Sequence, residues 1–185
     1  AYHILIFGKP SSKRAWGWRF EGHHVSLNYT IVNGKVSVVP SFWASNPAVA
    51  DFGPDRKLIA LEVEEFAARE LRNSLSAEQV KNAVIADKAP RDILTSALPE
   101  VKILENTGIT YGDLNKGQQA QLTKLIQEYI NRHRAVVAKE DWAKIEKGGL
   151  DKIRFSWAGS TKAFEPHYYR IQGPTFLMEY ANTQN

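Results

Sequence analysis

The order of strand-forming and helix-forming segments most constrains how this chain can fold. β-branched and aromatic residues are concentrated in residues 2–40 and 152–182, whereas residues 58–148 follow helical spacing. The strand–helix–strand alternation of a doubly wound parallel sheet is absent from the sequence. We therefore predict an α+β fold. Its mainly antiparallel sheet is built from the N-terminal and C-terminal strands, which share one sheet or sandwich, and a helical middle segment packs on it.

The N-terminal segment predicts a meander of three strands over residues 16–40. A strand over residues 23–31 would place His23 on a face with apolar residues, and His24 on the opposite face with Ser26 and Asn28. We interpret His23 as a core residue. The polar ladder around His24 is either ordinary solvent-facing sheet or the wall of a polar cleft. Asn33-Gly34 predicts the next hairpin turn.

Capping signals mark the helical middle. Ser76 with Gln79, and Asn115 with Gln118, fit capping boxes that each open a helix. Apolar residues then recur at helical spacing from Leu122 to Ile130. We predict a single domain over residues 1–185, with strands and a loop in 1–56, a helical insert in 57–149, and strands in 150–185.

Composition excludes several classes of protein. Hydrophobic residues make up 43% and charged residues 24% of the 185 residues, as in globular proteins. No apolar run approaches the roughly 20 residues of a membrane helix, so we expect no membrane partner. The basic residues behind the net charge of +4 are scattered, which does not favour nucleic acid as a partner. Cysteine is absent, which excludes disulfides and thiolate chemistry.

Both ends of the sequence are abrupt. The first residues already read as a strand, without an initiator methionine, and the last three are Thr183, Gln184 and Asn185. We expect the chain to be a fragment of a longer protein, with the remainder of that protein as a partner. The sequence does not specify a cellular compartment.

The register of the C-terminal hairpin decides which of its side chains can act together. With Gly173-Pro174 as a two-residue loop, His167 faces Tyr180 and Glu179 points to the opposite side. With Gln172-Gly173-Pro174 as a three-residue loop, His167 lies opposite Glu179, with Cβ atoms roughly 5 Å apart. The sequence leaves both registers open.

In the second register, His167 and Glu179 could bind a metal ion together with His24. Two imidazoles and one carboxylate form the ligand set of non-haem iron and of catalytic zinc. No local metal-binding motif such as HExxH supports this set. The alternative is a buried hydrogen bond between His167 and Glu179 that fixes the hairpin.

Three stretches of this sequence resemble a known family: WGWRFEGHHVSLNYTIVNG, PSFWASNPA and EPHYYRIQGPTFLMEYANTQN. The chain resembles, over almost its whole length, the bacterial family labelled domain of unknown function 3500. The resemblance implies a longer protein, in which the last strand runs on into a His-x-His segment. It supplies no established activity. The residues at positions that match the family's motifs are His23, His24, Asn28, His167, Arg170, Glu179, Asn182 and Asn185.

These observations lead to two functional hypotheses, beside a third in which the chain is a structural domain of a larger assembly. The first is a metal-dependent enzyme, hydrolytic or oxidative, that uses zinc, iron or copper held by His24, His167 and Glu179, which are also its catalytic groups. The second is a non-catalytic module that binds a small ligand or sugar. In either case we expect a small molecule as substrate or ligand, contacted by Asn28, Arg170, Asn182 and Asn185.

Overall fold

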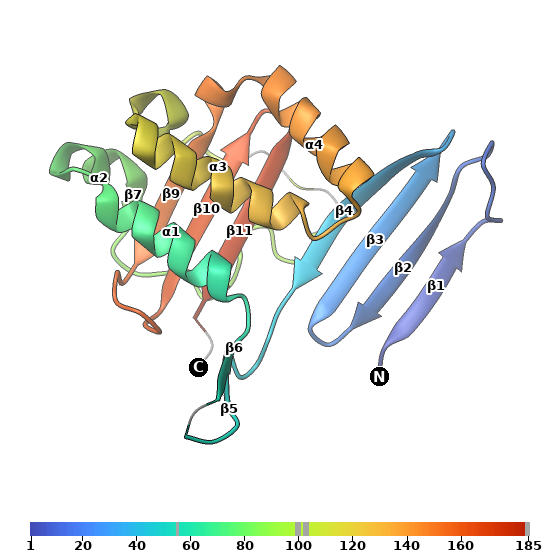
Figure 1. Cartoon of the computed structure of the whole chain (residues 1–185), viewed down its shortest axis with the longest axis horizontal. Helices are drawn as coiled ribbons and strands as arrows, with labels where there is room; N and C mark the ends of the chain where they lie inside the picture. The colour runs from blue at the N-terminus through green and yellow to red at the C-terminus, as the bar shows by residue number, and fades with distance from the viewer. Residues whose placement is uncertain (55, 99–100, 102–103, 184–185) are drawn as a thin grey trace. The chain divides into compact units, whose positions relative to one another are not determined.

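The computed structural model describes residues 1–54, 56–98, 101 and 104–183. The chain forms two compact units, residues 1–61 and 62–185, which are described separately (Figure 1). The single-domain organisation expected from the sequence stays a prediction. Within the described residues, no helix is long and apolar enough to cross a membrane.

The first unit is built on an antiparallel meander of four strands, in the order β1-β2-β3-β4. A separate pair of short strands, β5 and β6, follows it. The predicted meander is confirmed, with β1 added at its edge. The strands are β1 (His3–Phe7), β2 (Trp16–Gly22), β3 (Val25–Val32), β4 (Lys35–Trp43), β5 (Val49–Asp51) and β6 (Lys57–Ile59).

The two hairpin turns of this meander differ in how well the sequence predicted them. Asn33 and Gly34 form the expected turn between β3 and β4, with φ values of 50° and 76°. The strand expected from residue 23 begins instead at Val25, so the expectation that His23 and His24 lie on strand faces is wrong. Because Gly22 pairs with Val25, the two histidines become the turn between β2 and β3.

The second unit contains the four α-helices and the remaining strands of the described chain. The helices are α1 (Glu62–Ser74), α2 (Ala77–Ala83), α3 (Lys116–Ile130) and α4 (Ala135–Gly148). The strands are β7 (Val84–Ala86), β8 (Ile109–Thr110), β9 (Arg154–Gly159), β10 (His167–Gly173) and β11 (Phe176–Asn182). Two 3-10 turns, η1 (Tyr111–Asp113) and η2 (Leu150–Lys152), complete it. Both predicted capping boxes, at Ser76 and Asn115, are confirmed.

The sheet of this unit has the order β11-β10-β9-β7, and β8 also pairs with β9. All pairs are antiparallel except that of β7 with β9. An α+β fold with antiparallel sheets and a helical middle is therefore confirmed. In the described residues the N-terminal and C-terminal strands belong to two different sheets, and β7 and β8, from the middle of the sequence, pair with β9 in the second one. The alternative of a sandwich stays a prediction.

Helices cover one face of this sheet. Figure 1 shows α1, α3 and α4 on the same side of β9, β10 and β11. Phe155, Trp157, Tyr169 and Ile171 of the sheet form a core with the apolar residues of α1 and α3. Polar side chains at the buried centre of this face are shielded from water.

Candidate functional site

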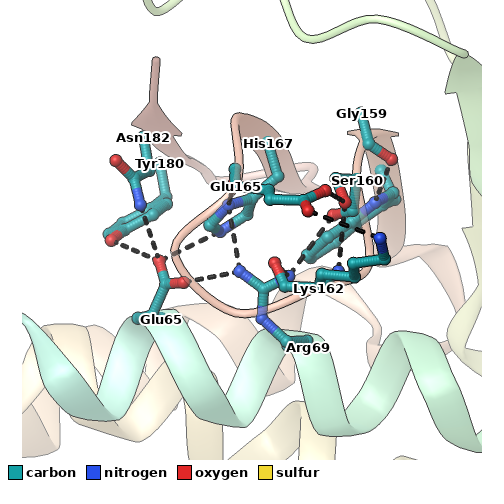
Figure 2. A network of polar contacts seen from close by, with 10 residues as sticks. Glu65, Arg69, Gly159, Ser160, Lys162, Glu165, His167, Tyr180 and Asn182 are labelled. Carbon is teal, nitrogen blue, oxygen red and sulfur yellow. Dashed lines mark hydrogen bonds and ion pairs between the residues drawn. The ribbon is translucent and has the colours of Figure 1, made fainter. Parts of the chain in front are cut away.

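Five polar side chains meet on the helix-covered face of the second unit. Glu65 and Arg69 come from α1, His167 comes from β10, and Tyr180 and Asn182 come from β11 (Figure 2). We refer to these five residues as the Glu65 cluster. His167 is fully buried, and Glu65 and Arg69 are only 2% and 5% exposed. Buried charges are costly unless they are paired, so the contacts within the cluster decide its stability.

The Glu65 carboxylate is at the centre of the cluster. Its Oε1 accepts a hydrogen bond from the Arg69 guanidinium at 2.5 Å. Its Oε2 accepts hydrogen bonds from the Tyr180 hydroxyl at 2.8 Å and the Asn182 amide at 3.4 Å. The same oxygen lies 3.2 Å from His167 Nε2. Three elements of the fold therefore meet at one carboxylate.

The Arg69 guanidinium also binds the loop between β9 and β10. Its Nη1 donates to the carbonyl oxygens of Ser160, at 3.3 Å, and Lys162, at 2.5 Å. The guanidinium also lies over the Trp157 ring, 5.7 Å from its centroid. These contacts compensate the desolvated positive charge and fix the loop above α1 (Figure 2).

The two nitrogens of His167 have different surroundings. Nδ1 lies 3.0 Å from the Glu165 carbonyl and 3.2 Å from Arg69 Nη2. We assign the proton to Nδ1, because the Glu165 carbonyl can only accept a hydrogen bond and lies nearer to Nδ1 than Arg69 Nη2 does. Nε2 faces Glu65 without an aligned hydrogen bond in the described chain. It is therefore the nitrogen that can accept a proton.

Aromatic rings hold the imidazole in place. Trp157 stacks on His167 with centroids 4.9 Å apart, and Tyr180 stacks with centroids 5.4 Å apart. These contacts leave the ring little freedom to rotate away from Glu65, so the direction of Nε2 is fixed by packing.

Local structure explains why these side chains converge. Glu65 and Arg69 are four residues apart on α1, which places them on one face of the helix. On the hairpin, His167 pairs with Asn182 and Tyr169 pairs with Tyr180. Side chains of paired residues point to the same face of a sheet, so His167, Tyr180 and Asn182 all point towards α1.

The surroundings shift the pKa values of the two central groups. Burial lowers the pKa of His167, and the Arg69 charge adds to this, although Glu65 opposes it. Burial alone would raise the pKa of Glu65, but His167, Arg69 and Tyr180 together bring it below its ordinary value. The cluster therefore combines an ionised carboxylate with a neutral imidazole at neutral pH.

Glu179 does not take part in the Glu65 cluster. It pairs with Arg170, and the two central residues of the hairpin turn are Pro174 and Thr175, because Gly173 pairs with Phe176. Both predicted registers are therefore wrong. Proline fits the first central position of a turn, which Pro174 occupies in the structure. The predicted two-residue loop had placed Pro174 at the second central position, where proline is disfavoured. His167 and Glu179 lie on opposite faces of the sheet, as the two-residue register had predicted and the three-residue register had not.

Glu179 instead holds a segment on the other face. Its carboxylate accepts hydrogen bonds from the backbone amides of Leu94 and Thr95, from the Thr95 hydroxyl and from the Tyr168 hydroxyl. The role of Glu179 seen in the structure is to fix the segment around residue 94.

Arg170 also lies on that second face and is 3% exposed. Its Nη2 donates to the Glu105 carbonyl at 2.9 Å and to the Thr107 hydroxyl at 2.7 Å. The guanidinium that we expected to contact a ligand is therefore used to hold residues 105–107 on the sheet.

The first unit contains the remaining expected site residues. The rings of His24 and His23 are 4.4 Å apart in the turn. Asn28 accepts a hydrogen bond from Arg19 at 2.6 Å and donates to Ser26 and to the Pro40 carbonyl. Asn182 is in the Glu65 cluster, and Asn185 lies outside the described residues.

The side chains of the Glu65 cluster that could bind a metal ion are His167 and Glu65. In the described part of the chain, no three His, Asp or Glu side chains form a group that could hold one. His167 Nε2 and Glu65 Oε2 face each other, but Arg69 already supplies a positive charge to the carboxylate. These residues therefore fit a proton better than a cation. Zinc, iron or copper as a cofactor stays a prediction.

Sequence reasoning missed Glu65, Arg69 and Tyr180. The signal for the first two was the i, i+4 spacing of opposite charges within a helix, but many solvated helix faces carry the same pattern. Tyr180 was named only as the residue facing His167 in one of the predicted registers. It lies next to His167, although in another register.

Comparison with known proteins agrees with the resemblance described above. The sequence profile of the family described as "Protein of unknown function (DUF3500)" matches residues 1–185. No curated protein and no solved structure gives a significant match. Since the profile spans the whole sequence, the chain belongs to the DUF3500 family of proteins of unknown function.

Proposed function

We propose that the protein is an enzyme that performs general acid–base chemistry on a small polar substrate, with His167 and Glu65 as its proton-transfer pair. The observation that carries this proposal is the 3.2 Å contact between His167 Nε2 and Glu65 Oε2 in a buried site. A neutral imidazole facing an ionised carboxylate can take up one proton and hold it between the two groups.

Tyr180 and Asn182 connect this buried pair to the partly exposed side of the cluster, where a substrate would bind. Both are partly exposed, and both donate hydrogen bonds to Glu65 Oε2. Burial and Glu65 raise the pKa of the Tyr180 hydroxyl, so Tyr180 gives its proton to Glu65 only as it accepts another from the substrate side, and Glu65 passes the proton on to His167 Nε2. Tyr180 and Asn182 are therefore the groups that would touch the substrate, whereas Arg69 positions Glu65.

Hydrolysis is the reaction that this arrangement serves best. As a water molecule attacks the substrate, its proton moves through Tyr180 and Glu65 to His167. When the bond breaks, the same proton returns to the leaving group, so the protein ends in its starting state. Fixing the acid–base groups in this way typically contributes about 10²- to 10⁴-fold to a rate.

A panel of p-nitrophenyl esters, phosphates and glycosides tests the proposal. We expect hydrolysis of at least one class of compound, reduced about 100-fold or more in His167→Gln and in Tyr180→Phe. Tyr168→Phe is the matched control, because it removes a tyrosine hydroxyl from Glu179 on the opposite face of the same hairpin. No hydrolysis by the wild type, or equal loss in folded Tyr168→Phe and Tyr180→Phe, would overturn the proposal.

Elemental analysis of the purified protein tests the metal-dependent form of this enzyme. About one equivalent of zinc, iron or copper, lost in both His167→Gln and Glu65→Gln but kept in Glu179→Gln, would support a metal at the Glu65 cluster. Metal kept in all three variants would place it elsewhere.

A non-catalytic module for a small ligand or sugar is the second candidate. The observation that favours it is the polar ladder on the first unit, where Arg19, Asn28, Ser26 and Glu21 are linked by hydrogen bonds and partly exposed. Titration calorimetry with neutral and acidic oligosaccharides tests it. Binding that is lost in Asn28→Ala and kept in His167→Gln would favour this function over catalysis.

A further inference from the structure

Strand β1 is an apolar edge strand with all five residues exposed. Its sequence is HILIF, and Ile4, Ile6 and Phe7 are 70%, 60% and 50% exposed. Within the described chain, β2 pairs with one edge of β1, and the order of the sheet places no strand on the other. The outer edge therefore offers unpaired backbone N–H and C=O groups beside large apolar side chains.

The opposite edge of the same sheet, formed by β4, has features that hinder pairing with another strand, and β1 lacks them. Strand β4 contains Lys35 and Pro40, and its register with β3 shifts between Leu27 and Tyr29. A lysine, a proline and an irregular register each hinder the addition of another strand. Strand β1 has none of these features.

We propose that β1 pairs with β1 of a second copy of this chain, antiparallel and about a two-fold axis at Leu5. This register places Leu5 opposite Leu5 of the second copy, Ile4 opposite Ile6, and His3 opposite Phe7. The Leu5–Leu5 and Ile4–Ile6 pairs each join two apolar side chains, and such cross-strand pairs stabilise a sheet. A symmetric pair of this kind is closed, as in most homodimers.

The neighbouring strand, β2, also favours pairing with a second copy of the chain. Ile4 pairs with Phe20, and Ile6 pairs with Trp18, so these four side chains share one face of the sheet. Tyr2 stacks on Phe20 on that face, with ring centroids 5.8 Å apart. Pairing of two β1 strands joins this face to its copy and places the Ile4 and Ile6 side chains of one copy beside those of the other. The sheet then has eight strands, with the protected β4 at each end.

Sedimentation velocity of the full chain over a range of micromolar concentrations tests the proposal. We expect a reversible dimer, which Leu5→Lys weakens about ten-fold or more because it places two lysines opposite each other. Val39→Lys is the matched control, since Val39 is 73% exposed on β4 and outside the proposed interface. A monomer at all concentrations, or equal weakening by both substitutions, would overturn the proposal.

A mixture of charge variants tests the register itself. Leu5→Lys and Leu5→Glu each weaken self-association, but together they form a heterodimer in which lysine faces glutamate at the two-fold axis. Hydrogen exchange of the β1 amides gives the second readout: we expect slower exchange as the concentration rises. Failure of the mixture to associate, or exchange that is already slow in the monomer, would show that a second copy does not occupy this edge.

Discussion

Glu65 Oε2 and His167 Nε2 lie 3.2 Å apart, although one residue is near the start of α1 and the other begins β10. The contact joins the helical layer of the second unit to its sheet. Both side chains are almost completely buried, so each depends on the other groups of the Glu65 cluster for compensation of its lost hydration. Stability and the proposed chemistry therefore depend on the same residues.

Glu65→Ala should destabilise the second unit strongly. The substitution leaves the buried Arg69 guanidinium without its carboxylate and removes the acceptor of the Tyr180 hydroxyl. Breaking a buried ion pair from one side typically costs about 3 to 5 kcal/mol, which urea unfolding would measure. Glu70→Ala, at an exposed position of the same helix, should change stability by less than about 0.5 kcal/mol. Similar effects of the two substitutions would contradict the importance of this pair.

Stability should fall as the pH is lowered from 7 to 5. Burial lowers the pKa of His167 in the folded protein, so the unfolded chain binds a proton at a higher pH than the folded chain does. The stabilising effect of the neutral imidazole is therefore lost progressively below its ordinary pKa of about 6.5, with a slope of at most about 1.4 kcal/mol per pH unit. Burial also lowers the pKa of His133, which adds a slope of the same sign.

Unfolding by urea across this pH range, in wild type and His167→Gln, separates the two histidines. The variant should keep only the part of the slope that comes from His133. At lower pH a second loss follows, because Glu65 has a lowered pKa and its stabilisation disappears as the carboxylate is protonated. An identical slope between pH 7 and 5 in both proteins would show that His167 does not titrate as inferred.

The features that the sequence predicted well are specified by contiguous residues. The capping boxes at Ser76 and Asn115 and the Asn33-Gly34 turn each depend on two to four neighbouring residues. The apolar stripe of α3, from Leu122 to Ile130, depends on spacing alone. These elements needed no knowledge of the rest of the fold.

Pairing between distant segments could not be predicted in the same way. The short segment Val84–Ala86 pairs with β9, which lies far from it in the sequence, and no local pattern identifies that partner. In the C-terminal hairpin, a change of one residue in the turn moves Glu179 to the other face. The partner of His167 therefore became visible only with the structure.

Glu179→Ala should release the segment around residue 94 from the second face of the sheet. The amides of Leu94 and Thr95 lose their acceptor, and the Thr95 hydroxyl loses one as well. Unsatisfied groups of this kind cost about 1 to 3 kcal/mol, so exchange of these two amides should become about 10- to 100-fold faster. Mass-spectrometric hydrogen exchange would measure this. Thr95→Val removes only the hydroxyl contact and should have a smaller effect; unchanged protection in Glu179→Ala would refute the anchoring role.

Gly108→Ala should destabilise the protein more than Gly34→Ala does, although both glycines have positive φ. Gly108 has φ of +102°, and an added Cβ would lie 2.3 Å from Ser156 Oγ and 2.5 Å from the Phe155 carbonyl oxygen. The alanine therefore combines backbone strain with a steric clash against β9, and we expect a loss of about 3 kcal/mol or more in urea unfolding. Gly34→Ala, with φ of +76° and open space around the added carbon, isolates the backbone contribution. It should cost about 1 kcal/mol, and equal losses at both positions would show that residue 108 does not approach β9 as closely as described.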